Sequence, residues 1–390
     1  MPHKIKIQTL NNISPKGLER FPLDRYEVAS EIIEPHAIML RSYNMHDMAL
    51  PESLLAVGRA GAGVNNIPVE RLTRMGVPVF NAPGANANAV KELVIAGMLL
   101  AARNICQAWD YTRGLSGDAE AMHRAVEDGK KQFVGFELAG KTLGVIGLGA
   151  IGVKVANAAL ELGMEVIGYD PTITVERAWK LSSEVMAATT ADELLQQVDF
   201  VTFHVPLVDT TRHLLNAERL SAMREGAVVV NFAREGIVDN DAVLAALDAG
   251  RLHAYVCDFP APALQGNPRV IALPHLGAST REAEENCAVM VADELRAYLE
   301  DGNVYNSVNF PTVRLPRSGQ ARIAIANENR PDMVGQISRT LGESGLNIDH
   351  MINESRGDIA YTLVDVDEPV PQAVAEALCG IDGVLKVRVL

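Results

Sequence analysis

Short apolar runs alternate with helix-forming segments along most of this chain. Between residues 4 and 82 the apolar runs predict four strands, at 5–10, 37–41, 54–60 and 78–81. A helical stretch at 69–75 separates the last two and breaks at Gly76. This alternation predicts a parallel sheet with helices on its faces. Ligands of such a sheet lie at the carboxyl ends of its strands, so we expect functional residues there.

The same alternation resumes after residue 141 and predicts six or so further parallel strands. A mostly apolar helix at 89–104 precedes this region, and a long amphipathic helix at 280–302 follows it. Residues 107–136 are polar and irregular, and we consider a contact with a partner subunit there. The six apolar runs lie at 142–146, 164–169, 200–204, 226–232, 253–257 and 270–273.

Residues 313–319 contain proline, glycine and arginine without periodicity, which is typical of a linker. The remaining residues, 320–390, show the order strand, helix, strand, strand, helix, strand. This order predicts a ferredoxin-like sandwich. The predicted fold class is therefore α/β, with two doubly wound Rossmann or flavodoxin-like domains followed by a C-terminal βαββαβ domain.

A glycine-rich turn follows the first strand of the second region. Gly147, Gly149 and Gly152 have G-x-G-x-x-G spacing between a strand and a helix, and Asp170 ends the next strand. This context predicts a dinucleotide cradle, in which the N–H groups at the helix start, around Ala150 and Ile151, meet the pyrophosphate. Asp170 would accept hydrogen bonds from a ribose diol and repel a 2′-phosphate, so NAD is favoured over NADP. The alternative is an ordinary βαβ unit whose glycines only form the turn.

Two arginines stand at consecutive strand ends of the first region, Arg41 before Ser42 and Arg59 before the loop of Gly61 and Ala62. A single exposed arginine is usually just solvated. Two at neighbouring strand ends favour a site for a phosphate or carboxylate group.

Arg234 and His275 both follow apolar strands of the second region. A guanidinium binds a carboxylate bidentately, and an imidazole is a base near neutral pH. Hydride transfer at a hydroxyl-bearing carbon requires both functions. A solvated arginine and a histidine at the edge of the core are the alternative, but their matching positions favour a joint catalytic role.

Composition narrows the range of partners. The 35 basic and 49 acidic residues give a formal charge of −14, which argues against nucleic acid or an anionic membrane as a main partner. The four cysteines have no metal or redox spacing, so we expect thiols in a reducing compartment and no metal. No apolar segment is long enough to cross a bilayer, and we expect a cytoplasmic protein.

Five segments together resemble the D-isomer-specific 2-hydroxyacid dehydrogenases, in the branch that oxidises 3-phospho-D-glycerate and carries a C-terminal ACT regulatory domain. They are VGRAGAGVNNI at 57–67, GVIGLGAIG at 144–152, NFAREGIVD at 231–239, ALPHLGAST at 272–280 and ENRPDMVGQI at 328–337. The resemblance implies a substrate domain from 1–88 and 283–312, an NAD-binding domain from 89–282 and an ACT domain from 320–390.

The resemblance also implies roles for individual residues. Arg234 would anchor the substrate carboxylate, and His275 would carry the proton. Arg41 and Arg59 would face the substrate phosphate, in a pocket completed by Ser42, Gly61, Ala62 and Asn86. The residues around NAD would be Gly147, Gly149, Ala150, Ile151, Gly152, Asp170, His204, Pro206, Phe232, Ala233, Arg234, Asp258, His275, Gly277 and Ala278.

The implied reaction is NAD-linked oxidation of 3-phospho-D-glycerate to 3-phosphohydroxypyruvate, the first step toward L-serine. Another 2-hydroxyacid dehydrogenase, such as a glyoxylate, hydroxypyruvate or 2-oxoglutarate reductase, is the nearest alternative. A further alternative is a non-catalytic protein that senses NAD.

The sequence departs from the family at one catalytic position. The family places a glutamate five residues beyond the aspartate matching Asp258, paired with the catalytic histidine. No acidic residue occurs here between Asp258 and Glu282. The imidazolium of His275 therefore lacks its usual partner unless Asp258 or another group takes that role.

Three asparagines in the C-terminal domain match positions that hold serine between two regulatory domains in serine-inhibited relatives. They are Asn327, Asn329 and Asn347. An L-serine effector and a homodimer or homotetramer are therefore expected. The alternative is that these residues are ordinary turn and strand-end asparagines.

Overall fold

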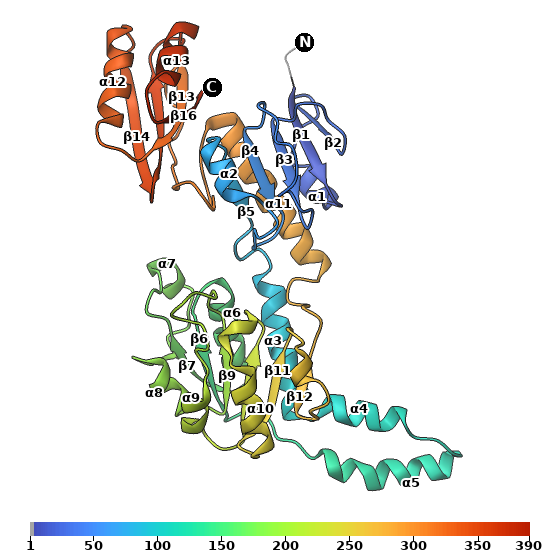
Figure 1. Ribbon diagram of the computed structural model, residues 1–390. Helices are drawn as coiled ribbons and strands as arrows, with labels where there is room; N and C mark the ends of the chain where they lie inside the picture. Colours follow the sequence, from blue (N-terminus) through green and yellow to red (C-terminus); the bar gives the residue numbers. More distant parts are fainter. Residues whose placement is uncertain (1–3) are drawn as a thin grey trace. The chain divides into compact units, whose positions relative to one another are not determined.

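The structure is a computed structural model that describes residues 4–390. The chain divides into two compact units. One contains the described residues up to Ala85 together with Arg281–Leu390, and the other spans Asn86–Thr280 (Figure 1).

A five-stranded parallel sheet forms the centre of the first unit, in the order β2-β1-β3-β4-β5. The apolar runs of the sequence predict four of the strands, and these are confirmed. The fifth, β2, is a four-residue edge strand that pairs only with β1, too short for a periodic pattern. The strands are β1 (Ile5–Leu10), β2 (Tyr26–Ala29), β3 (Ala37–Leu40), β4 (Ala56–Arg59) and β5 (Val79–Asn81).

Helix α11 (Arg281–Asp301) packs on this sheet, and the shorter α1 (Pro15–Leu18) and α2 (Val69–Arg74) also belong to this unit. The buried positions of α11 recur every three or four residues, so one stripe faces the core. Gly58 on β4 permits close packing, because a Cβ there would lie 2.5 Å from Cγ1 of Val291.

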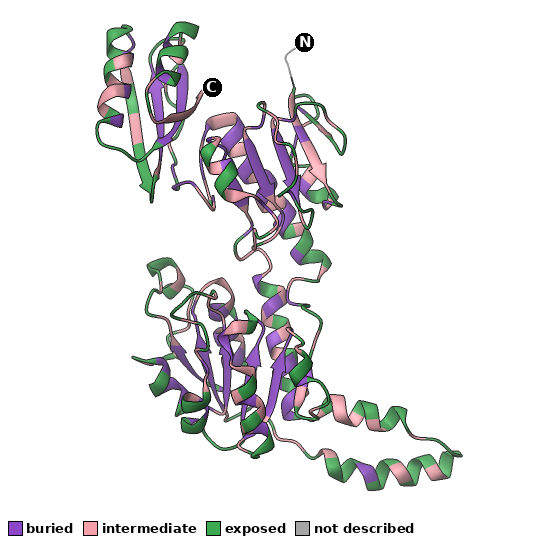
Figure 2. Ribbon diagram, in the orientation of Figure 1, coloured by how far each residue is buried: buried purple, intermediate pink, exposed green. Residues whose placement is uncertain are grey.

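The C-terminal domain has the predicted βαββαβ order, with an antiparallel sheet arranged β14-β15-β13-β16. Its inner strands are buried on both faces (Figure 2). On β13, Ile323 and Ile325 pack with the domain's helices, whereas Ala324 and Ala326 join the core around α11. The elements are β13 (Ala321–Glu328), α12 (Met333–Glu343), β14 (Ile348–Arg356), β15 (Ile359–Val366), α13 (Gln372–Cys379) and β16 (Val384–Val389).

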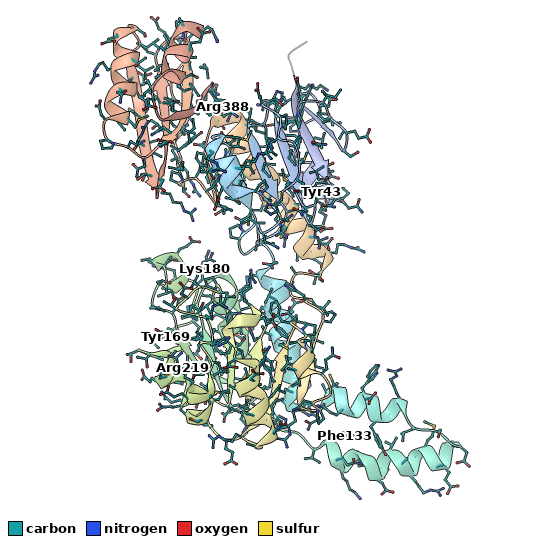
Figure 3. All side chains as sticks on the ribbon, viewed as in Figure 1. Tyr43, Phe133, Tyr169, Lys180, Arg219 and Arg388 are labelled. Carbon is teal, nitrogen blue, oxygen red and sulfur yellow. The ribbon has the colours of Figure 1, made fainter. Side chains whose placement is uncertain are left out.

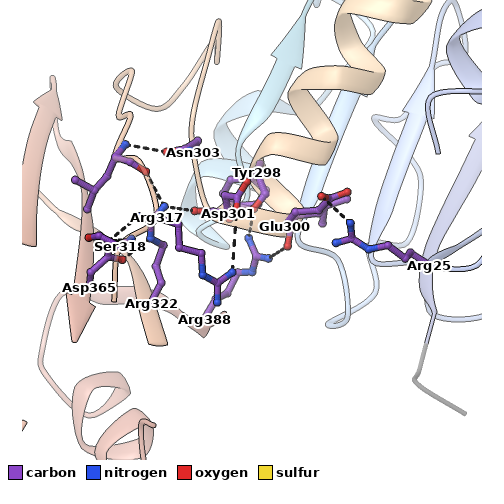
Figure 4. Close-up of polar contacts among 12 residues, drawn as sticks. Arg25, Tyr298, Glu300, Asp301, Asn303, Arg317, Ser318, Arg322, Asp365 and Arg388 are labelled. Carbon is purple, nitrogen blue, oxygen red and sulfur yellow. Dashed lines mark hydrogen bonds and ion pairs between the residues drawn. The ribbon is translucent and has the colours of Figure 1, made fainter. Parts of the chain in front are cut away.

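Two arginines of this domain bind the end of α11 (Figure 4). Arg322 is fully buried, pairs with Asp365 at 2.6 Å and donates to the carbonyl of Asp301 at 3.0 Å. Arg388 donates to the carbonyls of Tyr298 and Leu299, at 3.0 and 2.9 Å. Cations at a helix C-terminus are favourable, because the last carbonyls have no partner within the helix. The C-terminal domain is thus attached to the same helix that supports the first sheet.

The second unit contains a seven-stranded parallel sheet in the order β12-β11-β10-β9-β6-β7-β8. Apolar clusters lie on both of its faces. The six predicted strands are confirmed, and the seventh, β8, has only two residues. The strands are β6 (Thr142–Ile146), β7 (Glu165–Tyr169), β8 (Met186–Ala187), β9 (Phe200–Phe203), β10 (Ala227–Asn231), β11 (Leu252–Cys257) and β12 (Val270–Ala272), and the helices are α3 (Ala87–Ala102), α6 (Ala150–Glu161), α7 (Val175–Ala178), α8 (Ala191–Leu195), α9 (Ala217–Ala222) and α10 (Asn240–Asp248).

The expectation of irregular structure between residues 107 and 136 is wrong. The segment forms α4 (Ile105–Arg113), α5 (Ala119–Gly129) and a 3-10 turn, Lys130–Phe133. The hydroxyl of Tyr111 donates to the carbonyl of Ala125 at 2.8 Å, and its ring packs on Phe133, labelled in Figure 3. Asp118 caps α5 through the N–H of Ala121, and this cap was the sequence signal available. None of the described helices is both long and apolar enough to span a membrane.

Candidate functional site

The glycine-rich turn has the geometry of a phosphate cradle. Gly147 has a φ of +95°, and a Cβ there would lie 2.6 Å from the carbonyl oxygen of His204. A side chain at Gly152 would collide with the carbonyl of Gly147, whereas the space beside Gly149 is open. The first turn of α6, which begins at Ala150 and Ile151, has no side-chain cap. Its free N–H groups and the open space fit a pyrophosphate.

Asp170 is held in place at the end of β7. Its Oδ2 accepts a hydrogen bond from the N–H of Leu148 at 2.8 Å, and its Oδ1 accepts from the N–H of Thr172 at 2.8 Å. The carboxylate therefore lies directly beside the glycine-rich turn. This is where a ribose diol would lie when a dinucleotide occupies the cradle.

His204 follows β9 and is unsuited to proton transfer. Although part of its surface is exposed, burial of the imidazole lowers the pKa of His204 to about 3, so the ring is neutral near pH 7. Its Nε2 lies 3.1 Å from Oγ1 of Thr202. Pro206 continues this loop, and its carbonyl accepts from the hydroxyl of Thr211 at 2.6 Å.

Asn231, which sequence reasoning missed, fixes the loop after β10. Its Nδ2 donates to the carbonyl of Arg234 at 2.9 Å, and its Oδ1 accepts from the N–H of Ala233 at 3.2 Å. Phe232 packs in the core against α3. Nη1 of Arg234 donates to the carbonyl of Ala233 at 2.6 Å, and within residues 4–390 no carboxylate forms an ion pair with its guanidinium.

His275 lies after β12 in a strained conformation. Its φ of +37° is rare for a residue other than glycine, and such strain is typical of functional sites. Its N–H donates to the carbonyl of Asp258 at 3.1 Å, and its ring packs against Phe259 with 5.0 Å between centroids. The side chain is exposed and can reach a ligand.

Asp258 is a buried carboxyl group next to this histidine. It is 1% exposed, and neither side-chain oxygen has a hydrogen-bond partner of normal geometry among the described residues. Burial raises the pKa of Asp258, and the neighbouring His275, the backbone N–H groups of Gly277 and Asp258, and the guanidinium of Arg234 oppose that rise. Gly277 lies beside it, since a Cβ at Gly277 would be 3.7 Å from Oδ2 of Asp258, and Ala278 follows in the same turn. The structure thus brings Arg234, Asp258 and His275 to one edge of the sheet.

A cavity of about 560 Å³ opens beside Arg234 and Phe259. It also contacts His213 and Asp239. No group of three or more His, Cys, Asp or Glu side chains within the described part of the chain could hold a metal ion.

The two arginines of the first unit lie together at the ends of β3 and β4. Nε of Arg59 donates to the carbonyl of Arg41 at 2.9 Å, and Nη2 of Arg41 pairs with Oε1 of Glu284 at 2.7 Å. Burial and the charge of Arg41 lower the pKa of Arg59. An anion here would relieve the repulsion between the guanidinium groups and would compete with Glu284. Sequence reasoning missed Glu284, which only the packing of α11 brings to this place.

Neighbouring loops shape this arginine pair. The N–H of Ser42 donates to Asn11, and the carbonyl of Ala62 accepts from Asn81 at 2.5 Å. A Cβ at Gly61 would lie 2.6 Å from Nη1 of Arg59, so glycine lets that guanidinium cross the loop. Asn86 belongs to the second unit, at the start of α3.

The three asparagines of the C-terminal domain lie at opposite ends of its sheet. Asn327 and Asn329 are at the end of β13, and Oδ1 of the buried Asn327 has no partner among the described residues. Asn347 precedes β14 and interacts with Asp367, near the start of β13. One copy of the domain therefore does not bring all three together.

Comparisons with known proteins place the chain in a family. Residues 95–277 match the family model described as D-isomer specific 2-hydroxyacid dehydrogenase, NAD binding domain. The chain is 34% identical to D-3-phosphoglycerate dehydrogenase of Haemophilus influenzae, covering 100% of this chain and 95% of that protein. It is 32% identical to the Escherichia coli K12 enzyme of the same name, covering 99% and 98%.

A solved structure agrees in fold. It is the NAD⁺-bound 3-phosphoglycerate dehydrogenase of Entamoeba histolytica, with a TM-score of 0.59, 23% identity, and coverage of 79% of this chain and 99% of that one. The nearly full-length similarity and the α/β fold agree with the resemblance of the five sequence segments. This chain belongs to the D-isomer specific 2-hydroxyacid dehydrogenase family and contains the NAD-binding domain of that family.

Proposed function

We propose that this chain oxidises 3-phospho-D-glycerate to 3-phosphohydroxypyruvate with NAD. The choice of substrate rests on Arg41 and Arg59, whose positive charges lie close enough to oppose each other, because two neighbouring cations suit a doubly charged phosphate. The names of the two full-length relatives support the same choice. A glyoxylate or hydroxypyruvate reductase would have no phosphate to bind there.

Each step of the reaction has a candidate group. A dinucleotide held in the cradle would supply the acceptor for the hydride that leaves the hydroxyl-bearing carbon. Arg234 holds the substrate carboxylate and thereby fixes the position of that carbon. His275 takes the hydroxyl proton in the direction of oxidation. Asp170 and the first turn of α6 hold the dinucleotide.

Asp258 is proposed as the electrostatic partner of His275 in place of the family's glutamate. A buried carboxylate beside the ring stabilises the imidazolium that forms when the proton is taken up. Its main-chain carbonyl also accepts the N–H of His275 and so holds the two residues next to each other.

Replacing Asp258 by asparagine should move the acidic limb of the kcat/KM profile to lower pH, because the imidazolium loses its anionic neighbour. Asparagine keeps the shape of the side chain, so NAD binding should persist. Asp248→Asn, an exposed change at the end of α10, is the matched control. Coupling between Asp258 and the base is rejected if the two variants have the same pH–rate profile.

We also propose that L-serine inhibits the enzyme at a site completed by a second copy of the chain. Asn327 and Asn329 of one domain cannot meet their own Asn347, but a symmetric partner could supply it. Exposed apolar residues on the α4–α5 hairpin, including Trp109 and Val126, are suited to contact with a second copy as well.

Asn347→Ala should weaken inhibition by serine about tenfold, the effect of losing roughly one hydrogen bond. Titration of the NAD-linked rate with serine measures this effect. Asn353→Ala, on the same sheet, should respond like the unmodified chain, because Asn353 bonds to Thr362 instead. A flat response of the unmodified chain up to millimolar serine rejects the effector site.

A further inference from the structure

Two buried polar side chains on β11 have no role in the site described above. Tyr255 and Cys257 are 2% and 0% exposed and belong to the same apolar cluster, so they lie on one face of the sheet. In the register of the parallel pair, Cys257 lies opposite Asn231, the last residue of β10. A buried phenol hydroxyl is costly unless it has a polar partner. The two residues therefore bring polar groups to the carboxyl ends of β10 and β11.

The hydroxyl of Tyr255 connects these two strand ends. It interacts with the side-chain amide of Asn231 and with the thiol of Cys257. Asn231 is bound in turn to the loop after β10, through the carbonyl of Arg234 and the N–H of Ala233. An amide group has two N–H donors, so Nδ2 can donate both to that carbonyl and to the phenol oxygen. The phenol hydrogen can then be donated to the sulfur of Cys257.

The thiol of Cys257 extends these contacts toward His275. It donates to the carbonyl of Phe259, with 3.8 Å between sulfur and oxygen. The ring of Phe259 packs against that of His275, and the carbonyl of Asp258 accepts the N–H of His275. A strained backbone such as that of His275 persists when its surroundings fix it. Both of these contacts come from the short segment that Cys257 anchors.

The contacts from Asn231 through Tyr255 and Cys257 to Phe259 form a polar bridge between two loops. We propose that Tyr255 and Cys257 are positioning residues that hold Arg234 and His275 at a fixed separation. The inference rests on the proposed function, in which both groups act on one substrate molecule. The carboxylate and the hydroxyl of a 2-hydroxy acid are attached to the same carbon, so the groups that bind them must keep one relative position. Tyr255 and Cys257 are buried and act only through the loops that they anchor.

Tyr255→Phe tests the polar bridge with little change in shape, because it removes only the hydroxyl. We expect kcat/KM for 3-phospho-D-glycerate, measured as NADH formation, to fall about five- to tenfold, as for the loss of roughly one buried hydrogen bond. Tyr26→Phe is the matched control. Tyr26 is 1% exposed and donates its hydroxyl to Glu300 in the first unit. This variant also loses a buried hydroxyl, but its kcat/KM should equal that of the unmodified chain.

Substitutions at Cys257 separate the hydrogen bonds from packing. Cys257→Ala removes the sulfur and should lower kcat/KM about fivefold. Cys257→Ser keeps a donor and an acceptor, so its kcat/KM should stay within about twofold of that of the unmodified chain. A role in packing alone predicts the opposite, because serine fills no more of the apolar site than alanine and adds a polar group to it.

An NMR measurement tests the polar bridge without turnover. The signals of the His275 ring depend on its contact with Phe259, since an aromatic ring shifts the resonances of nuclei beside it. In the full chain labelled with ¹³C in the imidazole rings, His275→Asn identifies these signals among the nine histidines. Tyr255→Phe and Cys257→Ala should shift them. Tyr26→Phe and Cys257→Ser should leave them nearly unchanged.

An unchanged kcat/KM in Tyr255→Phe would overturn the proposal, and so would an equal loss in Tyr26→Phe. A loss in Cys257→Ser as large as that in Cys257→Ala also contradicts it. If the unmodified chain does not oxidise 3-phospho-D-glycerate, the proposed function fails, but the NMR measurement still applies. Signals of His275 that shift in Tyr255→Phe then support the polar bridge, and signals that do not shift reject it.

Discussion

His275→Ala should lower kcat for NAD-linked oxidation of 3-phospho-D-glycerate by about 10²–10⁴-fold, the usual contribution of a general base. His275 is exposed beside the buried Asp258, whereas His204 is neutral and bonded to Thr202 and cannot replace it. Stopped-flow or steady-state formation of NADH measures the loss. NAD binding, measured by calorimetry, should change little.

The control for this substitution is His123→Ala on α5, which removes an exposed imidazole from the α4–α5 hairpin. Its turnover should equal that of the unmodified chain. Near-normal turnover in His275→Ala would assign the proton to another group and reject the proposed mechanism.

Removal of both Arg41 and Arg59 should lower kcat/KM for 3-phospho-D-glycerate by about 10²–10⁴-fold, since each charge-assisted hydrogen bond contributes roughly 1.5–3 kcal/mol. The same double substitution should barely change the low rate with unphosphorylated D-glycerate, because that substrate has no group for the pair to bind. The result is thus a change in specificity rather than a general loss of activity.

Arg74→Ala, an exposed change on α2, is the control for a nonspecific effect of lost charge. Glu284→Gln should have the opposite effect on binding of the phosphorylated substrate. It frees Arg41 from its ion pair and should lower KM for the phosphorylated substrate. Equal losses with both substrates in the double variant would show that the arginines support the fold and do not select the phosphate.

The regular elements were predictable where burial is complete. Apolar runs such as Val228–Val230 lie in a strand covered on both faces, so the composition of the run and its length identify it. The α4–α5 hairpin was missed because its helices have no buried apolar stripe. They are held instead by a local cap at Asp118 and by Tyr111.

Only those residues of the candidate site that lie at strand ends could be predicted from the sequence. Strand ends indicate where Arg41 and Arg59 lie in the first sheet and where Arg234 and His275 lie in the second, because the parallel strands of each sheet end at one edge of that sheet. Side chains that approach from another element leave no such signal. Glu284 reaches Arg41 from a helix more than two hundred residues later.

The central claim is tested most directly by NADH formation with 3-phospho-D-glycerate and with D-glycerate, each measured with NAD on the unmodified chain. The account predicts a kcat/KM at least about 100-fold higher for the phosphorylated substrate, from the combined contribution of two charge-assisted contacts. An equal or higher kcat/KM for D-glycerate would contradict it.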